Sequence, residues 1–506
     1  MNKAYREVEQ HMRETSAIGS AAGLVGWDQE TMMPPKAAGS RAEQSAALAG
    51  VIHEKIVDPA IGRALKSLSK NPKDMSEAEK VCVREWLRDY MRAVKVPTEL
   101  VQEIARVTTL AHEAWIRARK TSDFKVFAPW LEKIMRLTRK EAEHIGYEEH
   151  PYDALLDHYE PGMTVRQLDP VIAALQRGLA PIAKRLIGSK ERPDTSLLRR
   201  RYPEADQEAI CREVIKLMGL DMDAARLDRS AHPFCCGIAP TDVRITTRFD
   251  ERWLPQALYG VIHESGHALY EQGLPEKSFG TPLAEGVSHG IHESQSRLWE
   301  NLIGRGLPFV RLIHPMLKKR FPSQLSGVSA RDLYRALGRV KSTPIRVEAD
   351  EVTYNLHIAL RYKLEKGLLV GKIKVRDLPG LWNEGMKELL GIKPRNDAEG
   401  VLQDTHWSQG LIGYFPTYLI GNLAAAQLWA AIRREVPCAE AMIARGKLSP
   451  VLEWLRTRIH RHGRRFSPAA LIERATGESL NQRHFLDYIK TKYGGIYGIG
   501  EWTQAR

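Results

Sequence analysis

The chain has 506 residues, of which 43% are hydrophobic and 27% are charged, a composition typical of a soluble globular protein. The charged opening segment MNKAYREVEQHMRETS excludes a secretory signal, and the run LIGNLAAAQLWAAI is too short and too polar to span a membrane. Five cysteines without C-x-x-C spacing form no disulfide framework, so we expect a cytoplasmic protein with no membrane partner.

Helices dominate the predicted elements. Apolar residues recur at three- and four-residue intervals in residues 103–120, 127–146 and 451–465. Residues 1–75 carry similar patterns, which predict a helical hairpin. No repeat, charge block or linker rich in proline, glycine or serine divides the chain, so we expect one domain over residues 1–506.

Few segments alternate with the period of two that is typical of strands. RITTRF at 244–249 does so, and it predicts an edge strand lining a substrate cleft. The tail GIYGIG at 495–500 is a weaker second candidate. We therefore expect only a small β element in a mostly helical protein.

The segment HESGH at 263–267 has the spacing of a zinc site. On a helix, His263 and His267 stand on one face with Cβ atoms roughly 5–6 Å apart, close enough for both imidazoles to reach one ion. Glu264 is rotated off that axis, so it can reach a metal-bound water without being a ligand. This arrangement predicts two metal ligands and a general base.

A catalytic zinc normally takes three protein ligands, and the third should follow in EGVSHGIHESQSRLWEN. Gly273 and Pro275 end the first helix, so a second helix can return beside it. Spacing alone does not choose among the candidates there, which are Glu285, His289, His292, Glu293 and Glu300.

The net charge of +13 raises a different function, nucleic-acid binding. The best local support is RTRIHRHGRRF at 456–466, where five arginines crowd together and where His460 and His462 offer an alternative metal site. Basic residues elsewhere are spread over amphipathic helices, and interleaved aromatic residues are sparse. We therefore expect no nucleic-acid partner, and a loop at a helix end for HRHGRR.

Five motifs follow one another along the chain. They are DVRIT at 242–246, HESGH at 263–267, HESQ at 292–295, IRVEAD at 345–350 and GVLQDTHW at 400–407. Together they resemble the carboxypeptidase Taq type of thermostable metallocarboxypeptidases, and the resemblance runs from GWDQETMMPP to the Lys492-Tyr493 end. It implies an all-α-dominated gluzincin fold, similar to angiotensin-converting enzyme and neurolysin, with a small β element beside a deep active-site cleft and residues 1–75 as a lid.

The resemblance also implies the chemistry. Zinc would be held by His263, His267 and Glu293, with Co²⁺ or Mn²⁺ as substitutes, and Glu264 would activate the attacking water. The expected reaction releases single residues from the free carboxyl termini of peptides, and the expected assembly is a homodimer. An endopeptidase or a dipeptidyl carboxypeptidase on the same scaffold is the enzymatic alternative.

An exopeptidase of this kind must bind a terminal carboxylate, and arginine can accept one with two parallel hydrogen bonds. Arg346 in IRVEAD is the first candidate and Arg244 in DVRIT the second. The alternative for either is a structural ion pair, with Asp350 or Asp242 as the nearby carboxylate.

Further contacts come from the segment after QDTHW, which is similar in order to part of angiotensin-converting enzyme. On that analogy His406 and Tyr418 would stabilise the oxyanion, and Tyr414 would contact the terminal carboxylate. Asp404 could orient a zinc-bound imidazole, because such rings usually donate their second N–H to a carboxylate or carbonyl oxygen, and a helix cap is the equal alternative. A core role remains the alternative for both tyrosines.

Overall fold

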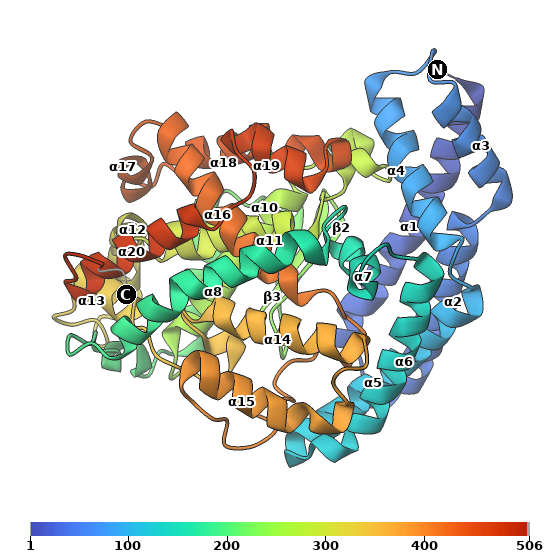
Figure 1. Cartoon of the computed structure of the whole chain (residues 1–506). Coiled ribbons are helices and arrows are strands. Elements are labelled where there is room, and N and C mark those ends of the chain that lie inside the picture. The colour runs from blue at the N-terminus through green and yellow to red at the C-terminus, as the bar shows by residue number, and fades with distance from the viewer. Residues whose placement is uncertain (1, 503–506) are drawn as a thin grey trace.

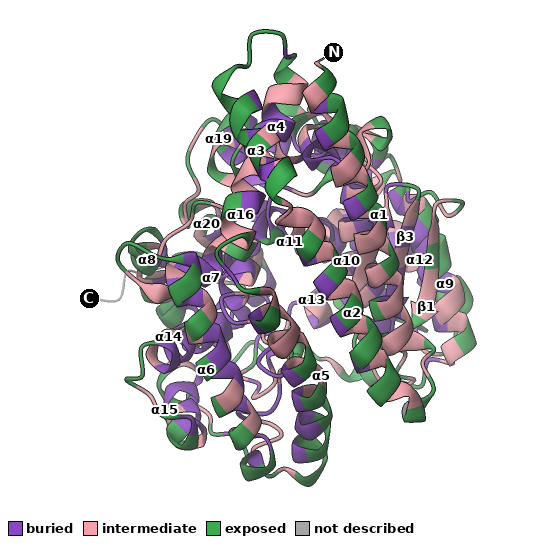
Figure 2. Cartoon of the chain, turned by 90° about the vertical axis from the view of Figure 1, so that its right-hand side faces the viewer, coloured by how far each residue is buried: buried purple, intermediate pink, exposed green. Residues whose placement is uncertain are grey.

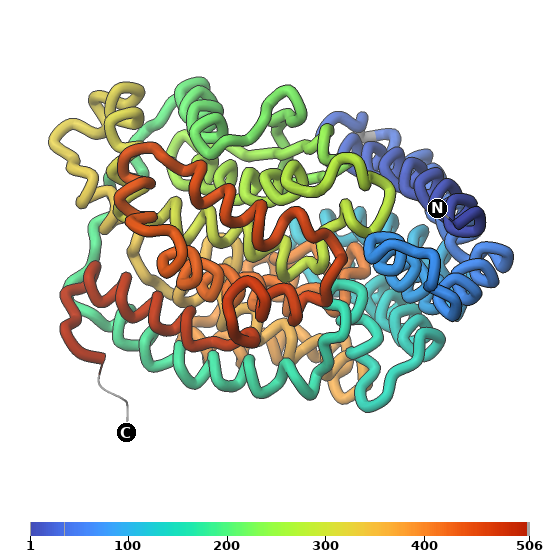
Figure 3. Tube along the Cα trace, turned by 90° about the horizontal axis from the view of Figure 1, so that it is seen from above, coloured from blue at the N-terminus to red at the C-terminus, as the bar shows by residue number. Residues whose placement is uncertain are grey.

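The amino-terminal helices stand at one side of the computed structural model, which describes residues 2–502 (Figures 1 and 3). They are α1 (Lys3–Thr31), α2 (Ala38–Ile56), α3 (Pro59–Lys70) and α4 (Glu77–Ala93). Residues 1–75, predicted as one hairpin, thus hold three helices. Tyr5, Leu65 and Trp86 belong to an apolar cluster of these helices, which Leu283 joins from the rest of the chain.

The remaining helices pack around two larger apolar clusters. The first cluster is built mainly from α5 (Thr98–Thr121), α6 (Ala128–Ile145), α7 (Pro151–Tyr159), α8 (Val165–Ile187), α14 (Tyr354–Leu369), α15 (Leu378–Leu390) and α20 (Arg483–Tyr497). The second is built mainly from α9 (Glu204–Met218), α10 (Leu254–Glu271), α11 (His289–Arg297), α12 (Leu307–Arg320), α13 (Ala330–Leu337), α17 (Ala439–Ala444), α18 (Ser449–Arg458) and α19 (Pro468–Thr476). Buried residues face inward from these helices, and exposed residues lie along their outer faces (Figure 2).

Helix α16 (Phe415–Glu435) lies between the two clusters and contributes to both. Its sequence, FPTYLIGNLAAAQLWAAIRRE, is apolar all round, which is typical of a helix buried on every side. Leu419 and Leu423 face the first cluster, whereas Ala424 and Leu428 face the second. Because α16 also packs closely on α11, it connects the core to the segment that carries HESQ.

The β element is one sheet of three strands, β1 (Ala225–Arg229), β2 (Cys235–Ala239) and β3 (Asp242–Thr247). The strand order is β1-β3-β2, with β1 parallel and β2 antiparallel to β3. The prediction of an edge strand in RITTRF was wrong, because β3 is the central strand. Val243 and Ile245 are buried with α10 in the second cluster, so this sheet packs against the helix that carries HESGH.

Two predicted elements end differently from the sequence pattern. The helical pattern over 451–465 ends as a helix at Arg458, and HRHGRR, expected to be a loop at a helix end, forms the 3-10 segment His460–Arg465. Gly463 has φ 49° and lies against the backbone of Leu283, where a side chain would clash. The tail predicted as a strand over 495–500 instead begins inside α20, which ends at Tyr497, and residues 498–500 follow the helix without strand structure.

None of the helices in the described residues 2–502 is both long enough and apolar enough to cross a membrane.

Candidate metal centre and active site

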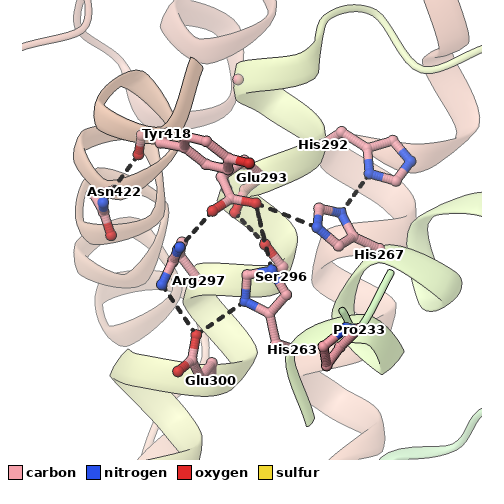
Figure 4. Close-up of polar contacts among 12 residues, drawn as sticks. Pro233, His263, His267, His292, Glu293, Ser296, Arg297, Glu300, Tyr418 and Asn422 are labelled. Carbon is pink, nitrogen blue, oxygen red and sulfur yellow. Dashed lines mark hydrogen bonds and ion pairs between the residues drawn. The ribbon is translucent and has the colours of Figure 1, made fainter. Parts of the chain in front are cut away.

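Two histidines of α10 face a glutamate of α11. His263 and His267 stand one turn apart, with ring centres 5.0 Å from each other. Oε2 of Glu293 lies 3.2 Å from Nε2 of His267 and 3.6 Å from Nε2 of His263 (Figure 4). Each of the three residues offers one ligand atom, and these atoms all lie within 4.8 Å of one another.

The three residues fit a zinc ion. With bonds of roughly 2.0–2.2 Å, a tetrahedral site separates its ligand atoms by about 3.4 Å, and the separations of 3.2 and 3.6 Å are close to that value. The structure therefore brings together the ligand set that the resemblance implied. Of the other candidates for the third ligand, Glu300 and His292 contact the Nδ1 atoms of the two histidines, on the side away from the cluster of ligand atoms. Glu285 pairs with Arg464, and His289 packs against Tyr414.

The charges in this cluster suit metal binding. Burial lowers the pKa of His267 to about 3, so its imidazole is neutral and Nε2 keeps its lone pair. Burial alone would raise the pKa of Glu293, but Arg297 and the two histidines outweigh it and hold that pKa well below its usual range. Nε of Arg297 donates to Oε1 of Glu293 at 2.6 Å. The sequence analysis missed Arg297, although its position one turn after Glu293 favours such a pair.

Glu264 lies next to the cluster without belonging to it. The residue is 6% exposed, and burial raises the pKa of its carboxyl group to about 7. A group with this pKa can take a proton from water and release it again near neutral pH. Its environment is therefore that of a general base.

The second ring nitrogens of the two histidines have different partners. Nδ1 of His263 lies 2.9 Å from Oε2 of Glu300, and Nδ1 of His267 lies 2.6 Å from Nδ1 of His292 (Figure 4). Glu300 belongs to the π-helical segment Leu298–Gly304, which continues α11. The prediction that Asp404 orients a zinc-bound imidazole was wrong, because Glu300 and His292 occupy those positions.

Asp404 instead joins two buried arginines. Nε and Nη2 of Arg346 donate to its Oδ1 at 2.9 and 2.7 Å, and Arg361 donates to its Oδ2. Nη1 of Arg346 donates to the Tyr354 hydroxyl at 2.7 Å. Arg346 thus has the structural ion pair named as its alternative, with Asp404 as the partner in place of Asp350.

Asp350 is a turn residue in the structure. Its carboxylate accepts hydrogen bonds from the backbone N–H groups of Lys341, Val352 and Thr353. Burial raises its pKa to about 6, which these hydrogen bonds limit. Asp350 therefore orders the segment before α14 and contacts neither Arg346 nor the metal cluster.

The guanidinium of Arg244 is also bound to other side chains. It donates twice to Asp242 at 3.0 Å and lies over the ring of Trp27 in α1, 4.6 Å from its centre. Side chains alternate along a strand, and the neighbours Val243 and Ile245 face α10. Arg244 therefore lies on the face of the sheet opposite the metal cluster, toward α1, and its role in substrate binding stays a prediction.

His406 and the two tyrosines form one group. Nε2 of His406 lies 2.9 Å from the Tyr418 hydroxyl, and the ring of Tyr414 lies 5.5 Å from that of His406. Burial raises the pKa of both phenols, with a contribution from the negative charge of Glu293, so both hydroxyls stay protonated. This group therefore offers hydrogen-bond donors near the metal cluster.

The sequence analysis missed His232, in the loop between β1 and β2. Burial lowers the pKa of His232, Arg346 and Arg248 lower it further and Asp404 opposes them, and the charge of His232 in turn lowers the pKa of His406. It therefore stands near this polar group. No motif or spacing in the chain pointed to it, because the loop reaches the site only through the folding of the sheet.

Comparison with known proteins agrees with this geometry. A family model described as carboxypeptidase Taq (M32) metallopeptidase matches residues 7–493. The chain belongs to this family. It is therefore a metallocarboxypeptidase, a hydrolase that uses a divalent metal ion.

Relatives match along nearly the full chain. Thermostable carboxypeptidase 1 of Thermus thermophilus is 45% identical over 98% of this chain and 99% of its own length. Carboxypeptidase 1 of Bacillus subtilis is 39% identical over 96% of this chain and 97% of its own length. The M32 carboxypeptidase structure from Deinococcus radiodurans R1 has a TM-score of 0.94 at 39% identity, over 98% of this chain and 100% of that chain. The predicted helical fold is confirmed.

Proposed function

We propose that this metallocarboxypeptidase uses zinc to hydrolyse the last peptide bond of peptides and releases single amino acids. The observation that carries the proposal is the cluster of His263, His267 and Glu293 with the buried Glu264 beside it. Co²⁺ or Mn²⁺ could fill the same ligands. Metal analysis of the purified protein, followed by activity after reloading with each ion, tests the choice of zinc.

The residues divide the chemistry among them. His263, His267 and Glu293 would hold the zinc ion, which would supply a Lewis acid for the substrate carbonyl and for activation of the attacking water. Glu264 takes the proton from the attacking water and passes it to the leaving amine. The Tyr418 hydroxyl, held by His406 at 2.9 Å, donates to the developing oxyanion.

The terminal carboxylate is assigned to Arg346, with Tyr414 as a second contact. A guanidinium has five N–H groups, and Arg346 uses three of them on Asp404 and Tyr354. One N–H on each Nη atom remains for a substrate. Asp404 holds the guanidinium of Arg346 in place. Because lysine lacks this guanidinium, Arg346→Lys should raise KM for peptides with a free carboxylate more than it lowers kcat.

Paired peptides that differ only in a free or an amidated carboxyl terminus test the exopeptidase. The proposal expects release of one residue from the free form and little cleavage of the amide. Equal cleavage of both forms would show an endopeptidase, and release of dipeptides would show the dipeptidyl alternative. The basic segment offers little to nucleic acid at two of its five arginines, because Arg464 is bonded to Asp89 and Glu285 and Arg458 is bonded to Glu435.

We also propose that residues 1–75 act as a lid within one domain. The apolar cluster of α1, α3 and α4 supports this, because it is separate from the two larger clusters, with Leu283 joining it from the body and α2 packing against α5. Peptide-dependent changes in hydrogen exchange along α1 and α2, with none in α16, would support a lid.

A cytoplasmic location and a homodimer complete the proposal. Five free cysteines, two of them adjacent, favour a reducing compartment. The homodimer rests on the family resemblance alone. Cell fractionation and light scattering on the purified protein test the two assignments.

A further inference from the structure

His292 and Glu271, which lie outside the proposed ligand set, form a line of hydrogen-bonding side chains that starts at His267. Nδ1 of His267 lies 2.6 Å from Nδ1 of His292, and Nε2 of His292 lies 2.6 Å from Oε1 of Glu271. Glu271 follows His267 by one turn on α10, and His292 precedes Glu293 on α11. The three side chains are 15%, 22% and 19% exposed in the order His267, His292, Glu271, so water competes only partly for these contacts.

The hydrogen bonds from His267 through His292 to Glu271 all run in one direction. Nε2 of His267 is the atom that lies 3.2 Å from Glu293 in the metal cluster, so His267 as a metal ligand carries its proton on Nδ1. Nδ1 of His267 then donates to Nδ1 of His292, and Nε2 of His292 donates to Oε1 of Glu271.

Neighbouring glycines make room for the arrangement. A Cβ at Gly237 of β2 would lie 2.6 Å from the Glu271 carboxyl carbon, and a Cβ at Gly286 would lie 3.2 Å from the His292 ring. The Tyr270 ring lies 5.0 Å from that of His292, and its hydroxyl accepts from the backbone of Val287. The imidazole of His292 is thus held in position from several sides.

We propose that His292 and Glu271 are positioning residues for the metal centre, which fix His267 in the tautomer that presents Nε2 to the metal. The inference rests on the metal centre proposed above. It also gives the two histidine ligands different supports, because His263 contacts the carboxylate of Glu300 directly at 2.9 Å. Such partners of a metal-bound histidine typically contribute about 10–100-fold in metal affinity.

Zinc affinity, measured by competition with a chromophoric chelator, tests the proposal. His292→Leu keeps much of the side-chain volume but offers no acceptor, so we expect zinc to bind about 10–100-fold more weakly. In His292→Gln the amide oxygen can still accept from His267, and binding should recover in part. Gln272→Leu, next to Glu271 but bonded to the Asp221 backbone, is the control and should bind as the wild type does.

A double-mutant cycle tests whether Glu271 acts through His292. Glu271→Gln should weaken zinc binding in the wild type and add nothing in the His292→Leu background. Wild-type affinity in His292→Leu, equal losses in both His292 variants, or additive losses in the cycle would each overturn the proposal. Thermal unfolding of the metal-free variants controls for misfolding. A wild-type protein that binds no zinc would instead refute the proposed function.

Discussion

Glu264 has the environment of a general base, since burial raises its pKa to about 7 while it stays outside the ligand set. We predict that Glu264→Gln lowers kcat by about 10²–10⁴-fold, because the amide cannot take the proton from water. Zinc content should stay at the wild-type level, because His263, His267 and Glu293 are unchanged. Peptide hydrolysis and metal analysis on the same preparation check both parts. Unimpaired turnover in this variant would remove Glu264 from the mechanism.

Glu160 is a second buried carboxyl group, beside the first turn of α11. It is 1% exposed and accepts from the Gly290 backbone, and burial raises its pKa to about 8. The folded state therefore holds its proton more tightly than the unfolded chain, whose glutamate has a pKa near about 4.3. The stability that this proton contributes is present at pH 4 and is lost as the pH rises to about 8.

We predict that Glu160→Gln flattens the decline in stability between about pH 5 and pH 8, because an amide does not ionise. One pKa unit corresponds to about 1.4 kcal/mol, so the effect is on the order of a few kcal/mol. Thermal unfolding of the metal-free protein at several pH values measures it, with the exposed Glu148→Gln as the control. Parallel pH profiles for wild type and Glu160→Gln would contradict the prediction.

At the scale of elements, the site depends on how closely α10 and α16 approach α11. A Cβ at Gly266 of α10 would lie 2.7 Å from Cα of Ser296, and a Cβ at Gly421 of α16 would lie 2.5 Å from Cγ of Glu293. Both glycines have α-helical backbone conformations, so they are needed for the close contact between helices and not for an unusual φ angle. The fourth residue of HESGH thus sets the distance between the two histidines and the third ligand.

We predict that Gly266→Ala destabilises the protein by about 1–3 kcal/mol, because the clash is with backbone that cannot rotate away. It should also weaken zinc binding, since α11 must move with Glu293. Gly260→Ala on the same helix is the matched control. Its Cβ would meet nothing closer than 3.6 Å, so the greater helix propensity of alanine should stabilise it by about 0.5–1 kcal/mol. Denaturant unfolding and chelator competition compare the two variants.

The sequence predicted best the elements that depend on contacts between residues close together in the chain. Periodicity gave α5 and α6 nearly to their ends, because their apolar faces recur regularly. It did not predict the 3-10 form of His460–Arg465, where Gly463 packs on a distant loop. It also missed the helical tail, because α20 is held by packing on the core. It also placed β3 at an edge, since the two flanking strands lack clear alternation.

At the scale of the whole molecule, the last helix ties distant parts together. Nζ of Lys492 in α20 lies 2.5 Å from Oε1 of Glu351, just before α14, and Oε2 of Glu351 accepts from the Tyr488 hydroxyl. The side chains of Lys492 and Glu351 are only 7% and 6% exposed. Lys492 also approaches the carbonyl of Asn301 in the π-helical segment, so one side chain links three parts of the fold.

We predict that Lys492→Met lowers the free energy of unfolding by about 3–5 kcal/mol, because it leaves Glu351 buried without its cation. Denaturant unfolding of the metal-free protein measures the loss. Lys140→Met on the outer face of α6 is the exposed control and should change stability by less than about 0.5 kcal/mol. A similar, small change in both variants would contradict a structural role for the pair.

The sequence by itself determined the helical class, the two histidines with Glu264, and the five motifs that indicate a metallocarboxypeptidase. These follow from short-range spacing, since residues four apart on a helix must share a face. Only the tertiary structure decided that Asp404 pairs with Arg346, that Arg244 lies behind the sheet, and that His292 supports His267. Those contacts join segments far apart in the chain, and the packing of whole helices and strands, which no local pattern encodes, sets their distances.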